Sequence, residues 1–324
     1  MKNRLFRIGC WVALALLLPV KVMAQFDAHF NNYWELKGFY NPSWAGQTGK
    51  LNLTGTYSMQ LTAFKRAPKV MYFGADMPFQ LGKRRHGVGL SFMNNTLGLF
   101  SRKDLGAQYA FLLKLGKGKL SVGAQIGFTS VTYDPKKLDL GEGDAGNDPA
   151  FPTAEQNAMG LDLGFGAMYV HPDFYVSLSG AHITGPTLEL SEASAEGNGS
   201  SMRIRPMLYL MGAYNIRLAN PLLKIQPSVL LQSDLNRFRA DITGRVIYTY
   251  QERSFFGGLT YSPDISLTAS LGATIKGVTF GYAYEFFTSG IGVASGNHEI
   301  FIRYAMDLNL FKKGKNKHKS IRIL

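Results

Sequence analysis

The sequence predicts an all-β protein, a transmembrane antiparallel β-barrel of the outer-membrane type, with about fourteen strands. Three observations predict this fold. Apolar residues alternate with small or polar ones through most of the chain, which is the period of a half-buried strand. No second apolar stretch approaches the roughly eighteen residues that a membrane-spanning helix needs. A secretory leader precedes the alternating pattern.

Residues 1–24 have the features of a signal peptide that is removed before Gln25. Basic residues come first, and the apolar run CWVALALLLPV then spans only about eleven residues, which is too short to cross a bilayer. A short membrane anchor is the alternative. The sole cysteine, Cys10, lies in this leader, so we expect a mature chain with neither disulfides nor a cysteine-ligated metal.

The composition is that of a membrane barrel more than that of an ordinary soluble domain, with 36 Gly, 22 Phe, 16 Tyr and only 18% charged residues. The leader holds four basic residues and no acid, so its removal lowers the formal charge from +13 to +9. Six of those positive charges belong to the last thirteen residues, KKGKNKHKSIRIL. The remaining chain is nearly balanced, which argues against a nucleic-acid partner.

Three segments near the C-terminus show the alternation most clearly. In ISLTASLGATI (265–275), the apolar residues occupy one face and Ser, Thr and Gly the other, and VTFGYAYEF (278–286) and IFIRYAMDLNL (300–310) repeat the pattern. A closed barrel in lipid needs apolar side chains toward the hydrocarbon and polar ones toward the lumen. A soluble sandwich would bury the apolar face and would rarely need so many strands of about ten residues.

The alternation divides the chain into a barrel at 50–311 and a basic periplasmic tail at 312–324. The predicted strands are 50–60, 68–78, 86–96, 99–115, 119–133, 158–170, 173–182, 204–218, 222–233, 236–250, 253–262, 265–275, 277–287 and 297–311. The longest connections follow the fifth, seventh and thirteenth strands, so they emerge at one end. Outer-membrane barrels have short periplasmic turns, which predicts periplasmic termini and outward long loops.

Some inner-face positions deviate from this pattern. Tyr209 and Met211 make the inner face of the eighth strand less polar than its neighbours, and the second and third strands alternate weakly. Pro227 falls inside the ninth strand, where its missing N–H would interrupt the ladder and could mark a bulge.

The sequence offers little that resembles a catalytic or cofactor site. GEGDAG (141–146) matches a nucleotide-binding spacing, but it follows no buried strand and opens no helix, so we interpret it as an acidic outer loop. Asp144 and Asp148 fit no known calcium loop. No histidine has a partner at zinc-site spacing. We therefore expect no enzyme, no cofactor and no metal; the alternative is a membrane-embedded hydrolase whose residues converge in space.

Charged residues of both signs on inner strand faces form the first candidate site. One interpretation is a salt-bridge network filling the lumen, and the other is a binding surface for a segment that enters it. The basic tail likewise has two interpretations, a disordered end or an electrostatic handle for an acidic periplasmic partner. The candidate lumenal charges are Arg239, Asp241, Arg245, Glu285, Glu299, Arg303 and Asp307.

The segment at 25–49 forms the second candidate site, because it precedes the first strand and contains GFYNPSWAG (38–46). Asn-Pro favours an extended or turning backbone, Ala-Gly allows close approach, and the large aromatics need a place to pack. We expect a periplasmic or lumenal segment that packs against the barrel or docks a partner. Its candidate residues are Phe39, Asn41, Pro42 and Trp44.

The chain resembles the PorP/SprF family of outer-membrane proteins of the type IX secretion system of Bacteroidetes. The resemblance is carried by FDAHFNNYWELKGFYNPSWAG after the leader, by GKLNLTGTYSMQ and APKVMYFGADMP in the first hairpin, and by GNHEIFIRYAMDLNLF, with His298-Glu299 and Tyr304. Between these segments the likeness is one of layout. Two features depart from the family pattern: NNYWELK replaces an expected Gln-Tyr, and Trp44 stands where a smaller aromatic is common.

The resemblance implies a non-enzymatic outer-membrane component of type IX secretion, a system linked to gliding motility. Such a protein exports or anchors adhesins at the cell surface. Its partners would be outer-membrane lipid and either the secretion ring and motor proteins or the C-terminal domain of a secreted adhesin. A passive channel or hydrophobic-solute transporter is the alternative. The sequence leaves open whether this chain is a core component or a cargo receptor.

Overall fold

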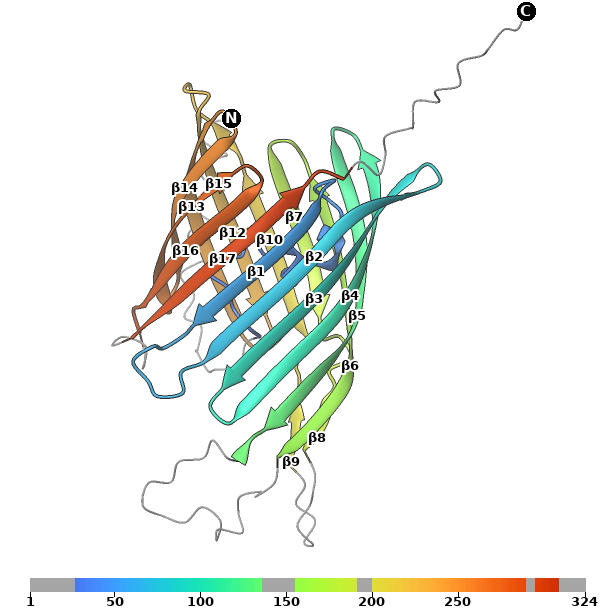
Figure 1. Ribbon diagram of the computed structural model, residues 1–324, viewed down its shortest axis with the longest axis vertical. Coiled ribbons are helices and arrows are strands. Elements are labelled where there is room, and N and C mark those ends of the chain that lie inside the picture. The colour runs from blue at the N-terminus through green and yellow to red at the C-terminus, as the bar shows by residue number, and fades with distance from the viewer. Residues whose placement is uncertain (1–26, 136–154, 191–199, 290–294, 309–324) are drawn as a thin grey trace, which may run out of the picture.

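The structure, a computed structural model, describes residues 27–135, 155–190, 200–289 and 295–308. Within them, fourteen antiparallel strands close into a barrel, as the alternation predicted (Figure 1). No helix in the described part of the chain is long and apolar enough to span a membrane. The predicted leader, the acidic loop at 141–146 and the basic tail lie outside these residues.

Barrel closure depends on the antiparallel pairing of β1 with β17, the first and last wall strands in the sequence, and the pairing of β10 with β12 completes the ring. The two-residue β11 (Ile216–Arg217) extends β10. The wall strands are β1 (Leu51–Met59), β2 (Lys69–Leu81), β3 (Arg84–Leu97), β4 (Phe100–Leu115), β5 (Gly118–Tyr133), β6 (Gln156–Val170), β7 (Phe174–Ala181), β10 (Met207–Tyr214), β12 (Leu223–Ser233), β13 (Phe238–Tyr250), β14 (Arg253–Ser262), β15 (Ser266–Ile275), β16 (Val278–Phe287) and β17 (Gly296–Met306).

The two ends of the barrel differ in their connections. Leu51 lies opposite Met306, so β1 begins where β17 ends. We name this the short-turn end, because brief turns such as 82–83 and 116–117 join its strands; it is the upper end in Figure 1. The three long connections all lie at the opposite end, as predicted. One of them contains the hairpin β8 (Thr187–Leu190) and β9 (Ser200–Arg203), which the sequence pattern did not predict.

The two faces of the wall follow the predicted alternation. On β15, Leu267 and Leu271 point outward and are 45% and 63% exposed, whereas Ser266, Thr268 and Ser270 point inward and are buried. Small polar groups are buried on the inner face and large apolar ones are exposed on the outer face. This is the reverse of the arrangement in a soluble protein, and it is the one that lipid requires.

Pro227 interrupts the wall without a bulge, contrary to the bulge considered from sequence. Ala213 lies opposite Ser228 and Ile216 lies opposite Ile225, so the register is the same on both sides of the interruption. On its other side, Pro227 pairs in register with Gly244. The proline only removes a ladder donor, which separates β11 from β10.

Residues 27–50 form a segment inside the barrel, which we name the lumenal segment. It contains one turn of α-helix, α2 (Lys37–Tyr40), and the 3-10 helix η1 (Pro42–Trp44). Its aromatic side chains join a core with inward-facing wall residues. That core contains Ala28, Phe30, Tyr33, Trp34, Leu36 and Tyr40 of the segment, and Val70, Tyr72, Met93, Met207, Tyr209, Met211 and Leu230 of the wall. The inner faces that alternate poorly in sequence are therefore those that contact the lumenal segment.

Candidate interaction site in the barrel lumen

The first described residue, Asp27, is held by a buried cluster near the long-connection end. Its carboxylate lies 3.1 Å from Arg102 Nη1 and 3.0 Å from His182 Nε2, and accepts a 3.0 Å hydrogen bond from the Tyr209 hydroxyl. His182 Nδ1 lies 2.8 Å from Asp162. Burial opposes the charge of His182, but Asp27 and Asp162 outweigh it and raise its pKa to about 10. The cluster therefore fixes the start of the lumenal segment through charge-assisted bonds.

His29 joins three of the sequence-predicted charges. Arg239 donates from Nη2 to His29 Nε2 at 2.8 Å, lies 3.0 Å from Asp241 and 3.3 Å from Glu285. Burial and the neighbouring guanidinium of Arg239 lower the pKa of His29, which keeps the imidazole neutral and able to accept this bond. The sequence pattern predicted that these charges face the lumen. It did not predict that His29 joins them.

Glu299 acts as a buried acceptor for the backbone of the lumenal segment. It is 0% exposed. The backbone N–H of Asn31 donates to one carboxylate oxygen at 2.8 Å, and that of Asn32 donates to the other at 2.8 Å. The Asn32 side chain adds a 2.7 Å bond. One wall carboxyl thus satisfies three donors where the segment has no regular structure.

Glu35 lies between the remaining two inner-face arginines. It is 3.1 Å from Arg303 and 4.0 Å from Arg245, and Arg245 also stacks over the Trp34 ring at 4.2 Å. Asp307 does not join this group, because it pairs with Lys50 at 3.1 Å and its side chain is 82% exposed.

The rest of the lumenal segment is positioned by Asn41, at the Asn-Pro step. Its side-chain oxygen caps η1 by accepting a 2.8 Å bond from Ser43 N. Its amide donates to Ser177 Oγ at 2.7 Å and to the Ala167 carbonyl at 3.1 Å. Pro42 begins η1, where its fixed φ and missing N–H cost nothing. Asn41 therefore ties the segment to both β6 and β7.

After Asn41, the backbone of the lumenal segment packs directly against inward-facing glycines of the wall. A Cβ added at Gly87 would overlap the Ala45 carbonyl, and one at Gly123 would lie 2.5 Å from Ser43 N. Gly46 has φ of +69° and donates its N–H to Asp76 at 2.9 Å. Only residues without side chains permit this approach.

Two aromatics of the second candidate site are less deeply buried than the other aromatics of the lumenal segment. Phe39 and Trp44 are each half-buried, while Phe30, Trp34 and Tyr40 are fully buried. Phe39 packs edge-on against Phe30 at 5.0 Å between ring centroids. The Trp44 ring lies 4.6 Å from Lys37 Nζ. Burial lowers the pKa of Lys37 to about 7.

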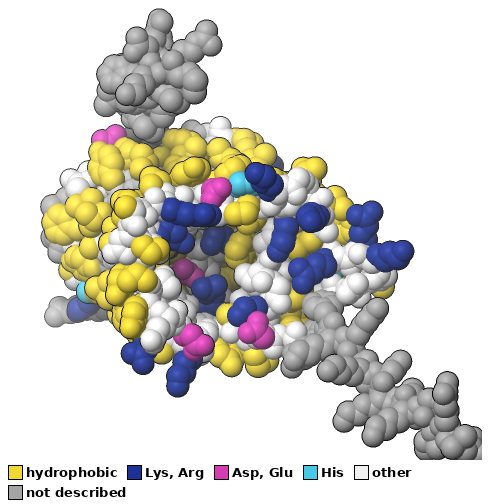
Figure 2. All heavy atoms as spheres, turned by 90° about the horizontal axis from the view of Figure 1, so that it is seen from above, with side chains coloured by type: hydrophobic (Ala, Val, Ile, Leu, Met, Phe, Trp, Pro, Cys, Tyr) yellow, Lys and Arg dark blue, Asp and Glu magenta, His cyan; other side chains and the backbone are white. Residues whose placement is uncertain are grey.

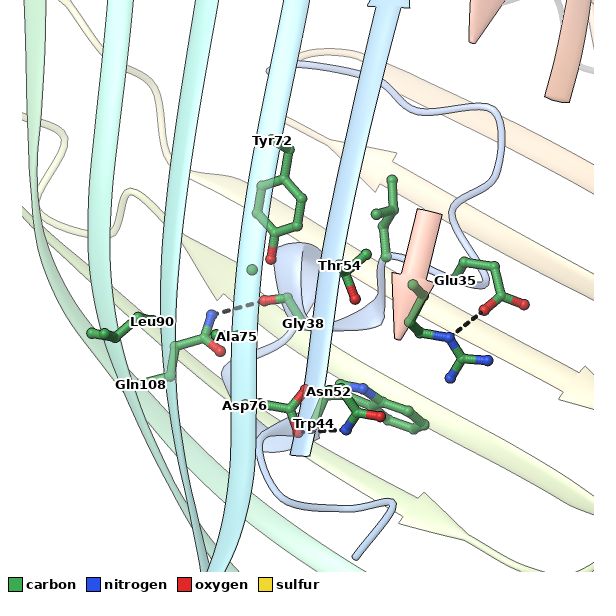
Figure 3. A pocket seen from close by; sticks show the side chains of 13 residues that line it. Glu35, Gly38, Trp44, Asn52, Thr54, Tyr72, Ala75, Asp76, Leu90 and Gln108 are labelled. Carbon is green, nitrogen blue, oxygen red and sulfur yellow. Dashed lines mark hydrogen bonds and ion pairs between the residues drawn. The ribbon is translucent and has the colours of Figure 1, made fainter. Parts of the chain in front are cut away.

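A polar cavity separates the lumenal segment from the wall of β1 to β4 (Figure 3). Gln108 donates across it to the Gly38 carbonyl at 2.8 Å, and within the wall Asn52 donates to Asp76 at 3.0 Å. Two pairs of lining residues, Gln108 with Gly38 and Arg303 with Glu35, join the wall to the segment at this cavity.

Among the residues that the structure describes, one carboxylate and histidine group has atoms close enough for a metal ion: Asp27, Asp104 and His182, with ligand atoms within 4.8 Å of one another. Arg102 already contacts both acids, at 3.1 Å and 2.8 Å. A guanidinium at the centre supplies the positive charge that a metal would bring. The group is therefore better described as an ion-pair cluster. Sequence spacing could not indicate it, because its members are far apart along the chain.

Comparison with known proteins identifies the family. The profile described as "Type IX secretion system membrane protein PorP/SprF" matches residues 22–304. The chain belongs to the PorP/SprF family. This confirms the resemblance that the first hairpin, the closing strand and the lumenal segment suggested.

Other comparisons describe architecture only. A search of curated proteins found no match to this PorP/SprF-family sequence. Among solved structures, the CymD monoaromatic hydrocarbon channel is similar, with 14% identity and a TM-score of 0.49 over 89% of this chain and 95% of that one. The Pseudomonas putida toluene transporter TodX has 11% identity and a TM-score of 0.49 over 87% and 95%. Acinetobacter baumannii Omp33 has 8% identity and a TM-score of 0.45 over 79% and 98%.

Proposed function

We propose that this PorP/SprF-family barrel serves type IX secretion as a non-enzymatic anchoring or export component. It would hold a partner protein, such as the C-terminal domain of a secreted adhesin or a secretion-ring protein, at the outer membrane. The observation that carries the proposal is the lumenal segment, which occupies the interior through ionic and backbone contacts and leaves the ends of the barrel as the surfaces for partners.

The lumenal contacts argue against a passive channel. An open pore needs lining groups that face water, but Glu299, Glu285 and Asp241 are each at most 1% exposed and are bonded within the lumen. Their partners come from the chain itself. A solute would have to displace the lumenal segment and leave buried charges unpaired, which is costly.

The proposed orientation places the short-turn end in the periplasm, together with both termini. Short periplasmic turns and longer outer loops are the rule in barrels of this type. The long connections would then face the cell exterior, where a surface adhesin would be held, and the short-turn end would face the secretion machinery.

The proposal is tested by purifying the tagged protein from native outer membranes in mild detergent, with mass spectrometry of whatever accompanies it. We expect secretion-ring proteins or a large surface adhesin in near-stoichiometric amount. The identity of that partner distinguishes a core component from a cargo receptor. Isolation of the barrel alone, together with steady conductance in planar bilayers, would contradict the proposal and favour the passive channel.

A further inference from the structure

The short-turn end carries a strong excess of positive charge. Figure 2 views this end and shows Lys and Arg side chains outnumbering acidic ones around a central hollow. The turns and strand ends that form it contribute Lys50, Lys83, Arg84, Arg85, Lys114, Lys117, Lys119, Arg217, Lys224, Arg253 and Lys276. The acids in the same turns and strand ends are Asp173, Glu252 and Asp307.

Five of these cations occupy inward-facing positions along the wall from β3 to β12, and we name them the basic arc: Arg85, Lys114, Lys119, Arg217 and Lys224. Their direction follows from the pleat, because residues two apart on a strand share a face. Lys114 continues the inward series that includes the buried Ala110, and Lys224 continues the one that includes Ser228. The arc therefore lines the mouth of the barrel.

Two pairs within the basic arc place like charges directly opposite one another. Lys114 lies opposite Lys119 between β4 and β5, and Arg217 lies opposite Lys224 between β11 and β12. Like charges at such positions destabilise a sheet. An anion at this mouth would relieve the repulsion.

The described part of the chain supplies little of that negative charge. Asp173 contacts Arg217 at 2.8 Å, and Asp307 contacts Lys50 at 3.1 Å. No described acid lies within ion-pair distance of Lys114, Lys119 or Lys224. The C-terminal tail is itself basic, so its charge cannot balance the arc.

The inward direction also favours a protein over a lipid. Lipid headgroups surround the outside of a barrel, whereas the basic arc faces the axis. An extended polypeptide carrying carboxylates can enter the mouth and contact several of these cations together. Complementary charge of this kind speeds association and selects partners.

We propose that the basic arc binds an acidic segment of a protein partner that enters the barrel mouth from the short-turn end. The periplasmic origin of that partner rests on the orientation in the proposed function. The charge complementarity does not depend on that orientation.

The test uses the full-length protein in nanodiscs of neutral phosphatidylcholine and a short fluorescein-labelled oligoglutamate peptide, with binding followed by anisotropy. We expect saturable binding that added salt weakens. The double substitution Lys114→Glu and Lys119→Glu should weaken it about tenfold or more, because it converts attraction at the mouth into repulsion. Lys114→Arg with Lys119→Arg should retain it.

The matched control is Lys65→Glu with Lys69→Glu, which reverses two exposed lysines at the opposite end. It should change the affinity by less than about twofold, because these lysines lie far from the mouth. Equal losses in the two double variants, or no binding by the parent protein, would overturn the proposal. So would binding of anionic-lipid vesicles that depends on Lys114 and Lys119 without peptide binding. Co-purification of secretion partners is a separate result, so the two proposals can fail independently.

Discussion

The two halves of the lumenal segment are attached to the same wall by different physical means. Residues 27–35 are held by ion pairs and by hydrogen bonds to charged groups: Asp27 and Glu35 pair with wall arginines, His29 accepts from Arg239, and the backbone at 31–32 donates to Glu299. Residues 38–46 are held by close backbone approach to wall glycines and by the capping side chain of Asn41.

This difference teaches which chemistry can hold an irregular chain inside a barrel. Where the wall carries long polar side chains, the segment stands away from it and needs explicit partners for its N–H groups. Where the wall carries glycine, the segment lies directly on the strands, and close packing of the two backbones fixes its position. Substitutions in the two halves should therefore fail by different mechanisms and to different extents.

The largest effect is expected in the glycine-lined half. Gly87→Val would drive a branched side chain into the Ala45 carbonyl, and backbone has little freedom to retreat. We expect a loss of about 3 kcal/mol or more in the free energy of unfolding, at or above the upper range for overpacking. Urea unfolding in detergent micelles, followed by tryptophan fluorescence, measures it.

Gly244→Val is the matched control, because a Cβ there meets nothing within 4 Å. It should leave the unfolding midpoint nearly unchanged. If both glycines tolerate valine equally, the backbone contact at Gly87 does not hold the segment, and the contrast between the halves disappears.

The barrel wall was more predictable from the sequence than the lumenal segment that it encloses. Strand number and face follow from alternation, since lipid imposes one rule on every outward residue, as on β15. Tyr209 and Met211 broke the rule because they face the lumenal segment. Pro227 suggested a bulge because sequence shows a lost donor but not whether the register continues beyond it.

The second prediction concerns the ionic half. Glu299→Ala would leave three buried donors from Asn31 and Asn32 without an acceptor. We expect a cost of about 3 kcal/mol, because unmatched buried polar groups are expensive. Glu299→Gln should cost less, since its carbonyl oxygen can still accept from Asn32. Urea unfolding of the two variants gives the comparison, and equal costs would argue that charge matters more than hydrogen-bond acceptance.

The candidate site shows where sequence reasoning stops. The inner-face charges could be listed because strand alternation gives their direction. Their partners, such as His29 for Arg239, could not, because an irregular segment has no periodicity to place its side chains. His182 was similarly hidden, since Asp27 and Asp162 reach it only through the fold.

The third prediction uses pH to test the contribution of His182 to the ionic half. The folded pKa of His182, about 10, exceeds the ordinary value of 6.5, so protonated His182 stabilises the fold fully below pH 6.5. That contribution is lost as pH rises toward 10, at most about 1.4 kcal/mol for each pH unit. Asp27, Asp162 and Arg102 face the imidazole. Between pH 6.5 and 9, the urea midpoint of the parent protein should fall relative to that of His182→Gln, because Lys37, with a pKa of about 7, titrates in both proteins and its opposite contribution cancels in the difference. Parallel slopes would show that His182 does not titrate in this range.

The smallest effect is expected at Asp307, the inner-face charge that lies outside the lumenal network. Its bridge to Lys50 joins side chains that are 82% and 42% exposed, so water and salt screen it. Asp307→Ala should cost less than about 0.5 kcal/mol, within the range of exposed ion pairs. The same urea titration detects this beside Glu299→Ala. If charge alone held the ionic half, the two acids would cost similar amounts. A small loss at Asp307 beside a large one at Glu299 would instead show that the lumenal segment depends on buried acceptors for its backbone.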